Sequence, residues 1–436
     1  MKGRTAGWVV TAAGTGVNLA LGVLYSWSIF KAAIRQSIEA GGAGAFQWDL
    51  TSVNDPYAVC CLVFAFGMIV AGRCQDVFGP RVTTMLGGVL VGAGFLWVSG
   101  TTTYGGWVFG FGVLAGTGIA FGYASATPPA MRWFAPNESG KIAGIVVAGF
   151  GLASVYIAPL SQYLVSRVGL STAMKLFGLG FFAVVSALAL LLRNPPPEHQ
   201  VAGVTDSRRR GGLNALVRQR WVEPDLTPGR FLSTGTFWLL WLLYFVGAGA
   251  GLMVIGSIAG LAKKSLGANA FAAVALMAVG NAGGRLVAGV VSDRLGRVKT
   301  LGIVFVLQAL LMVAAVPVTG SAGSGAVLVV LVATFIGFNY GANLALFPTM
   351  AKECAGVKNF GVNYGLLFTA WGVGGFVMSK VAERLSASGG SFRASFLLAA
   401  SLLVAGAVLS LFVTDHKAEQ FRRIRADLIR EGLAET

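Results

Sequence analysis

One charged residue stands alone in a long apolar stretch of the sequence. Between Ser265 and Ser292 the only charged residue is Arg285, eight residues before Asp293. Eight residues span ~12 Å along a helix, so the guanidinium lies inside the stretch rather than at its end. If the stretch crosses a bilayer, a charge at this depth costs about 3 kcal/mol or more and must face the protein interior, a partner or water.

The other apolar segments offer no acidic residue at a comparable depth to neutralise Arg285. Asp76 and Glu353 fall near the predicted cytoplasmic ends of their segments, and Asp55 and Glu383 fall near the outer ends. A planar guanidinium presents a fork of donors that suits a carboxylate. We therefore interpret Arg285 as the binding site for a substrate carboxylate. The alternative is that backbone carbonyls satisfy Arg285, or that its side chain extends toward the membrane surface.

Asn281 lies one helical turn before Arg285 on the same face, where it is expected to orient the arginine or to bind the substrate. Further candidates lie at or near the middle of predicted membrane segments and offer a hydroxyl, an amide or an aromatic face. They are Tyr123, Asn343, Tyr340, Trp371, Phe150 and Tyr25. For any one of them, packing between helices is an equally good explanation.

The composition places these residues in a membrane protein. Of the 436 residues 55% are hydrophobic and 11% are charged, whereas a soluble globular protein carries about 25% charged residues. A helix needs about 20 mostly apolar residues to cross the hydrocarbon core. Charged residues and two turn sequences, at 101–106 and 319–325, divide the chain into twelve such segments, the first of which lies between Arg4 and Lys31. The predicted fold is all-α, with twelve transmembrane helices in two pseudo-symmetric six-helix bundles.

The basic residues indicate the orientation. Of 33 Lys and Arg residues, 23 fall in cytoplasmic segments and 8 at the outer side if the N-terminus is inside, as the positive-inside rule requires. We predict an N-terminal bundle at 1–193, a cytoplasmic linker at 194–229, a C-terminal bundle at 230–415 and a cytoplasmic tail at 416–436. The lipid bilayer is thus an expected partner, and nucleic acid is not, because the basic residues do not gather on one folded face.

Other kinds of protein fit the sequence less well. The only histidines, His199 and His416, lie in the predicted linker and tail, and no paired carboxylates occur inside the membrane segments, which argues against an enzyme. The four cysteines show no zinc-ligand spacing, so no metal and no cofactor is expected. A channel would not need a single buried counter-charge.

A short pattern occurs twice at a constant offset of 217 residues. Gly72, Asp76 and Gly79 follow the second segment, and Gly289, Asp293 and Gly296 follow the eighth. This pattern resembles the loop motif of the major facilitator superfamily, which implies two related six-helix halves and alternating access. In that family the aspartate is thought to bridge to neighbouring basic residues and to hold the halves together in one state. The resemblance thus assigns a gating role to Asp76, Arg81, Asp293, Arg294 and Arg297.

Three shorter segments resemble the oxalate/formate antiporter group and the monocarboxylate transporters. These are Leu24–Phe30, the stretch from Arg132 to Gly151, and Asn363–Gly372. The animal monocarboxylate transporters pair an aspartate with the arginine, where this chain has Asn281. The oxalate exchanger type has a lysine where this chain has Trp371, so one fixed positive charge remains for one carboxylate.

The resemblance implies a transporter of small monocarboxylates such as lactate or pyruvate, coupled to proton symport. Exchange of organic anions, as of oxalate for formate, is the alternative, since no buried Asp, Glu or His is visible to carry a proton. The chain is expected in the plasma membrane, or in the inner membrane of a Gram-negative bacterium, with both termini cytoplasmic and a monomer as the functional unit.

Overall fold

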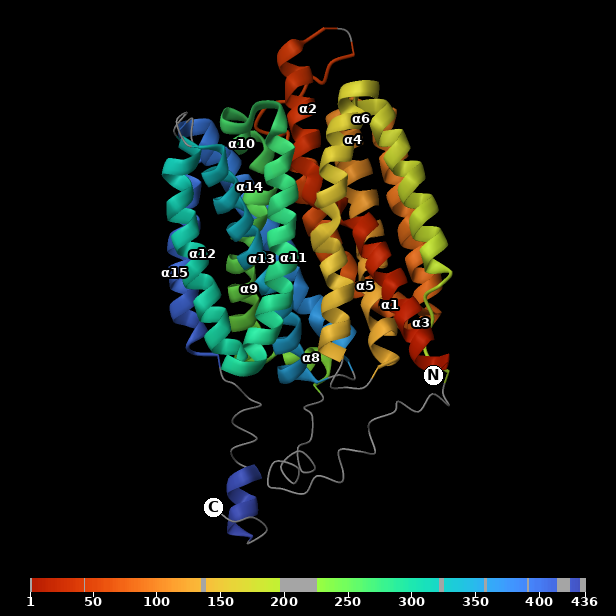
Figure 1. The fold of residues 1–436 in the computed structure, drawn as a ribbon, viewed down its shortest axis with the longest axis vertical. Coiled ribbons are helices and arrows are strands. Elements are labelled where there is room, and N and C mark those ends of the chain that lie inside the picture. The colour runs from red at the N-terminus through yellow and green to blue at the C-terminus, as the bar shows by residue number, and fades with distance from the viewer. Residues whose placement is uncertain are drawn as a thin grey trace.

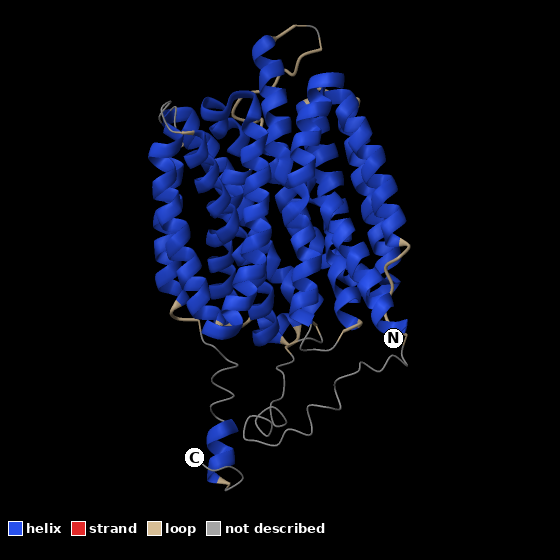
Figure 2. Ribbon diagram, in the orientation of Figure 1, coloured by secondary structure: helices blue, strands red, loops and turns tan. Residues whose placement is uncertain are grey.

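The computed structural model describes residues 2–42, 44–134, 139–196, 226–320, 325–356, 359–389, 392–413 and 424–431. All regular structure in these ranges is helical (Figure 2). Most of the predicted linker (194–229) and of the predicted tail (416–436) lies outside the described residues. The boundaries of the two bundles therefore stay predictions.

Within the described ranges, ten helical segments are long and apolar enough to cross a membrane. The first combines α1 (Lys2–Leu21), the 3-10 turn η1 (Gly22–Ser26) and α2 (Trp27–Ala40), and the third combines α4 (Tyr104–Trp107), the π-helical η2 (Val108–Ala115) and α5 (Gly116–Arg132). The others are α3 (Asp55–Ser99), α6 (Ser139–Ala189), α9 (Gly235–Ile255), α11 (Phe271–Leu295), α12 (Arg297–Gly320), α13 (Ala326–Ala355), α14 (Phe360–Gly389) and α15 (Arg393–Ser410). Two short helices, α8 (Pro228–Leu232) and α10 (Ile258–Leu266), precede and follow α9 in the chain.

Two of the ten segments each contain two crossings. α3 has 45 residues and α6 has 51, each more than twice the length that one crossing requires. α3 is interrupted at Gly79, with φ 80°, and α6 at Gly169, with φ 77°. This left-handed backbone favours glycine and ends a regular helix. With α3 and α6 counted twice, the described helices give the twelve crossings expected from the sequence.

The repeated sequence pattern has a repeated backbone conformation. Gly79 joins the two crossings of α3 with φ 80°, and Gly296, 217 residues later, joins α11 to α12 with φ 91°. Six crossings separate the two turns, so both lie at the same end of the bundle. The structure thus gives the two copies of the motif the same local form as well as the same spacing.

The chain forms two groups of helices that meet along two helix pairs. In Figure 1 the helices before residue 190, coloured red to yellow, lie on one side, and the helices from α9 onward, coloured green to blue, lie on the other. α6 packs against α11, and α3 packs against α14, across this boundary. We call residues 1–193 the N-terminal half and residues 230–415 the C-terminal half. The end of the bundle where α1 begins is called the proximal end, and the opposite end the distal end.

The first crossing extends further than the sequence indicated. The charge of Lys31 was expected to mark its end, but α2 continues to Ala40 and Lys31 is buried. Lys31 can lie inside the bundle because it pairs with Glu383 of α14. Near the middle of this crossing, η1 approaches α6 so closely that a Cβ atom at Gly22 would lie 2.5 Å from the carbonyl oxygen of Phe150.

α11, the helix that carries Arg285, is packed against α13 at backbone contact. A Cβ atom at Gly284 would overlap the carbonyl oxygen of Phe338, and one at Gly341 would overlap that of Asn281. Small residues permit this kind of approach between membrane helices. Arg285 follows Gly284 at about 100° around the helix axis, and its side chain reaches Val147 and Tyr25 of the N-terminal half.

We expect the substitution Gly284→Ala to destabilise the protein by about 1–3 kcal/mol or more, because two helix backbones must separate to admit a methyl group. The matched control is Gly283→Ala, where the new Cβ would lie 3.8 Å from Phe338 Cδ2, an ordinary contact distance. Thermal unfolding of the purified variants in detergent measures the effect. Equal unfolding temperatures for the two variants would contradict it.

Candidate substrate site

Arg285 lies at the junction of the two halves and is 2% exposed. Its Nε donates to Asn281 Oδ1 at 3.1 Å, its Nη1 donates to the carbonyl oxygen of Val147 at 2.6 Å, and its Nη2 donates to Tyr25 Oη at 3.4 Å. Asn281 is on the same helix, whereas Val147 (α6) and Tyr25 (η1) belong to the N-terminal half. The guanidinium is therefore held by its own helix on one side and by the opposite half on the other.

No carboxylate neutralises this guanidinium within the described part of the chain. The ion pairs found there involve Lys31, Arg297, Lys380 and Arg430 but not Arg285. A guanidinium has five N–H donors. The three contacts above use three of them, and the Tyr123 hydroxyl is a further hydrogen-bonding neighbour of the guanidinium. Some of the N–H groups of Arg285 are therefore hydrogen-bonded, but no described carboxylate neutralises its charge.

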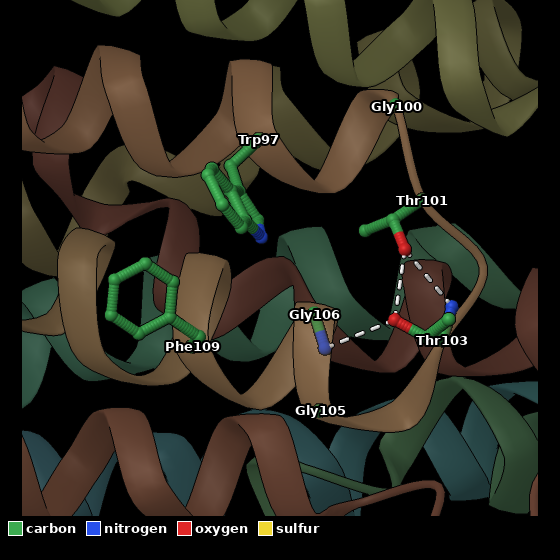
Figure 3. A pocket seen from close by; sticks show the side chains of 7 residues that line it. All are labelled: Trp97, Gly100, Thr101, Thr103, Gly105, Gly106 and Phe109. Atoms are coloured by element: carbon green, nitrogen blue, oxygen red, sulfur yellow. Dashed lines mark hydrogen bonds between the residues drawn. The ribbon is translucent and has the colours of Figure 1, made fainter.

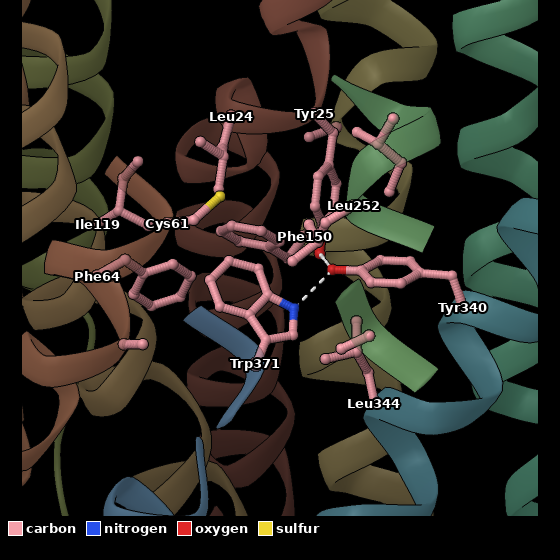
Figure 4. Packing of buried hydrophobic residues seen from close by; sticks show 14 of the residues in the cluster. Leu24, Tyr25, Cys61, Phe64, Ile119, Phe150, Leu252, Tyr340, Leu344 and Trp371 are labelled. Carbon is pink, nitrogen blue, oxygen red and sulfur yellow. Dashed lines mark hydrogen bonds between the residues drawn. The ribbon is translucent and has the colours of Figure 1, made fainter. Parts of the chain in front are cut away.

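A short hydrogen-bonded chain runs from Arg285 through Tyr25 of the N-terminal half to Tyr340 and Trp371 of the C-terminal half, and Figure 4 shows the last three of these residues. Tyr25 Oη lies 2.7 Å from Tyr340 Oη, and Trp371 Nε1 donates to Tyr340 Oη at 2.8 Å. Arg285 and Trp371 each donate one N–H, and the two hydroxyl groups bring two further donors. Only one hydroxyl hydrogen can lie between the two phenol oxygens, so the other finds no acceptor among the described residues. The network has more donors than acceptors.

Aromatic rings enclose the network. Phe150 contacts both Tyr25 and Tyr123 edge-on, with ring centroids 5.1 and 5.2 Å apart. Phe64 and Phe368 lie against Trp371, at 5.1 and 4.9 Å. The surroundings of Arg285 are therefore apolar except for the hydroxyl, amide and indole groups named above.

The structure brings together most of the residues selected from the sequence. Arg285, Asn281, Tyr25, Tyr340 and Trp371 are linked by hydrogen bonds. The Tyr123 hydroxyl is a further hydrogen-bonding neighbour of Arg285, and the Phe150 ring contacts both Tyr25 and Tyr123.

Asn343 is oriented differently from the other selected residues. Its Nδ2 donates to the carbonyl oxygen of Asn339, and its Oδ1 faces Gly247 of α9, inside the C-terminal half. Three residues after Tyr340, it is rotated by about 60° around the helix axis from that residue. The hydrogen bond that it makes to a described residue reaches neither Arg285 nor the hydrogen-bonded chain.

Three contributors were not identified from the sequence. The carbonyl oxygen of Val147 belongs to the backbone and has no signature in residue type. Phe64 and Phe368 lie in apolar segments where many aromatic residues occur, so only the folded arrangement distinguishes them.

A family model supplies the identity of this fold. Residues 6–379 match the model of the Major Facilitator Superfamily. The chain belongs to that superfamily. It is thus a member of a family of multi-pass membrane transporters, not of enzymes.

Similar proteins in the superfamily include transporters of known name. The oxalate:formate antiporter of Oxalobacter formigenes is 27% identical over 351 residues, which cover 80% of this chain and 77% of that protein. Human monocarboxylate transporter 11 is 26% identical over 413 residues, 92% of this chain and 82% of that protein. Among solved structures, a variant of the E. coli fucose:proton symporter FucP covers 93% of this chain and 98% of its own, with a TM-score of 0.61 and 13% identity, which shows a shared fold.

The loop motif of the superfamily takes different contacts in the two halves. In the C-terminal half Arg297 donates to Asp293 Oδ1 at 2.5 Å and to Glu353 Oε1 at 3.4 Å. These bonds stay within one half. In the N-terminal half Arg81 donates to the carbonyl oxygen of Leu192 at 2.9 Å.

The aspartate of the N-terminal copy faces the opposite half. Asp76 Oδ2 would lie 4.0 Å from a Cβ atom at Gly361, in the first turn of α14. Arg294 is exposed. A role of the motif in holding the halves together remains a prediction.

A cavity of about 460 Å³ lies where α3 ends and α4 begins, at the distal end of the N-terminal half, and Figure 3 shows the residues that line it. Its lining is Trp97, Gly100, Thr101, Thr103, Gly105, Gly106 and Phe109. Thr103 Oγ1 accepts from the backbone N–H of Gly106 and so caps the start of α4. With no charged residue in its lining, this cavity is not a candidate for binding an anion.

Removal of the Tyr340 hydroxyl is expected to lower stability. In the Tyr340→Phe variant the buried indole N–H of Trp371 loses its acceptor, which costs about 1–3 kcal/mol. Tyr244→Phe is the control, because Tyr244 is equally buried and its hydroxyl makes only a 3.5 Å contact to Tyr364. Thermal unfolding of the two purified variants gives the comparison. A smaller loss for Tyr340→Phe than for Tyr244→Phe would show that the network does not contribute to stability.

Proposed function

We propose that this protein transports small monocarboxylates, such as lactate or pyruvate, by alternating access, and that the substrate carboxylate binds Arg285. The observation that carries the proposal is the buried guanidinium without a carboxylate partner in the described structure. Arg285 stands where the two halves meet, which is where a carrier of this fold binds its substrate. The substrate supplies the negative charge that the protein does not.

The excess of donors in the network supports an anion as the ligand. A carboxylate brings acceptors only. It can accept from the N–H groups of Arg285 that the three contacts above do not use and from the spare hydroxyl of Tyr25 or Tyr340. The 3.4 Å contact between Arg285 and Tyr25 is the weakest of the three arginine contacts and is the one that we expect the carboxylate to replace. The aromatic rings then face the short carbon chain.

The number of buried cations in the site indicates how many carboxylates the substrate carries. Arg285 is the only fully buried cation near the network in the described chain, and the neighbouring position in α14 is Trp371. One cation suits one carboxylate, whereas a dicarboxylate favours two. The names of the two relatives, an oxalate:formate antiporter and a monocarboxylate transporter, support a small carboxylate as the substrate, and the single cation favours a monocarboxylate among these.

We favour proton symport as the mode of coupling and keep anion exchange as the second candidate. Symport is suggested by the resemblance to the monocarboxylate transporters. Exchange is favoured by the similarity to the oxalate:formate antiporter and by the lack of a described carboxylate beside Arg285. In the proposed arrangement a single chain is the transport unit, in the plasma membrane, with both termini cytoplasmic and the distal end outside.

Uptake into proteoliposomes distinguishes the two modes. Vesicles without internal anion are given radiolabelled lactate, pyruvate, formate or oxalate, with and without an inward proton gradient. Symport predicts uptake driven by the gradient into empty vesicles. Exchange predicts uptake only when the vesicles contain anion. Failure to take up any carboxylate under either condition would contradict the proposal.

The substitution Arg285→Ala should lower monocarboxylate uptake between about tenfold and 100-fold, because the charged hydrogen-bond partner of the substrate is lost. The control is Arg35→Ala, which removes an exposed arginine of α2. Both variants should remain monodisperse in size-exclusion chromatography. Unimpaired uptake by Arg285→Ala would remove this residue from the site.

The substitution Asn281→Asp should weaken substrate binding at neutral pH. The new carboxylate would occupy the position from which Asn281 Oδ1 now accepts the N–H of Arg285 at 3.1 Å, and it would compete with the substrate. Protonation of that carboxyl removes the competition, so uptake relative to the unmodified protein should rise as the pH falls. The apparent KM is measured across pH, with the uncharged Asn281→Ala as control. An identical pH profile for the two variants would contradict the prediction.

A further inference from the structure

The distal end of the bundle contains a second group of buried charges. Four charged residues in the described chain are nine-tenths or more buried: Lys31, Asp55, Arg285 and Glu383, at 7, 8, 2 and 9% exposure. Only Arg285 belongs to the proposed substrate site. The other three lie together, each paired with a residue of the opposite half. This arrangement requires an explanation of its own, because removing charged groups from water costs free energy that their pairing does not always recover.

Two ion pairs connect the halves at this end. Lys31 of α2 pairs with Glu383 of α14, and its Nζ also lies 3.5 Å from Ser257 Oγ. Asp55, at the start of α3, accepts from Lys380 Nζ of α14 at 2.5 Å.

The two pairs are complementary in sign. The N-terminal half contributes one cation and one anion, Lys31 and Asp55, and α14 contributes one of each, Lys380 and Glu383. The two α14 residues are three positions apart and so lie on one face of the helix. When the halves meet, all four charges are neutralised within the cluster. When the halves separate, each half presents one cation and one anion to water.

Asp55 also has a partner within its own half. Its second oxygen, Oδ2, accepts from Tyr104 Oη at 2.8 Å, and the Tyr104 ring lies edge-on to Trp48, at 5.7 Å. This contact holds the carboxylate in place independently of Lys380. Asp55 is therefore positioned to receive Lys380 again after a separation.

We propose that these two ion pairs form the distal gate of the transport cycle. They are closed in the structure described, and they separate when the halves rock apart at the distal end. The inference rests on transport by alternating access, which belongs to the proposed function, but it does not depend on Arg285 as the binding site. The competing explanation is a permanent structural tie that never opens.

Removing one charge of an ion pair should shift the equilibrium of the distal gate from the closed toward the open state. In Glu383→Gln the closed state contains a buried lysine without its counter-charge, whereas in the open state water solvates that lysine. The ratio of closed to open protein should therefore fall roughly tenfold or more. Lys31→Met, which removes the cation, leaves Glu383 buried and unpaired and should act in the same direction. The reversed pair, Lys31→Glu with Glu383→Lys, should restore closure.

The gate can be observed by the distance between spin labels on the full-length protein in nanodiscs. The labels are attached to cysteines that replace Thr102, between α3 and α4, and Ala387 of α14, both exposed at the distal end. The four native cysteines are first replaced by alanine, and this background must retain uptake. Electron–electron resonance then gives the distance distribution without substrate and with lactate. Glu39→Gln is the matched control, since Glu39 is an exposed glutamate of α2.

Glu383→Gln and Lys31→Met are expected to enlarge the long-distance population, and the reversed pair is expected to return it to the original value. Asp55→Asn and Lys380→Met test the second pair, with its own reversal, if the first reversed variant does not fold. Distributions equal to that of Glu39→Gln would overturn the gate. Distributions equal to that of Glu39→Gln, together with a lower unfolding temperature in every single variant, would establish a permanent tie instead.

The gate and the substrate site are tested by separate measurements. Arg285→Ala in the labelled background should lower uptake about tenfold or more, and adding Glu383→Gln to it should still enlarge the long-distance population. If uptake persists in Arg285→Ala while Glu383→Gln still opens the distal end, the site is wrong and the gate stands. If uptake is lost in Arg285→Ala but the gate variants behave as Glu39→Gln, the site stands and the gate is wrong.

Discussion

The structure depends on how a membrane-embedded bundle accommodates charge. An arginine near the middle of a membrane helix must be hydrogen-bonded, hydrated or neutralised. Here Arg285 is hydrogen-bonded to an amide, a backbone carbonyl and a hydroxyl, but no described carboxylate neutralises it. The helices around it are arranged to make this possible: α11 packs against α13 at backbone contact and directs the neighbouring guanidinium toward α6 and η1.

The remaining buried charges show what the same bundle does when a counter-charge is available. Lys31, Asp55 and Glu383 are all paired at the distal end. The contrast between a neutral group of charges and a single unneutralised one distinguishes two roles within one fold. Paired charges hold the halves together, whereas the unpaired charge is suited to a ligand that carries the opposite sign.

Much of this arrangement could be predicted from the sequence. The twelve crossings follow from the spacing of charges and turn residues, and Arg285 with Asn281 follows from one charge and one amide a helical turn apart. The depth of a residue in the membrane could also be predicted, and on this basis Tyr25, Tyr340 and Trp371 were selected.

The direction in which a residue points around the helix axis could not be predicted from its depth. Asn343, at a similar depth, therefore faces another part of the bundle. The charge of Lys31 was wrong as the mark of a helix end, because a residue of the other half, 352 positions away, neutralises it. The carbonyl of Val147 could not be identified at all, since every residue carries one.

The partners of Arg285 are divided unequally between the two halves. Asn281 is fixed to the same helix, while Val147 and Tyr25 are on the other side of the boundary. A rocking motion that separates the halves along α6 and α11 would leave the guanidinium with the amide alone. Under the proposed function, an empty carrier must give up two hydrogen-bond partners of this buried cation in order to reorient, whereas a carrier with a bound carboxylate keeps a charged partner for it. On that proposal the asymmetry gives the loaded form the lower barrier, so that crossing the membrane without cargo becomes the slow part of the cycle.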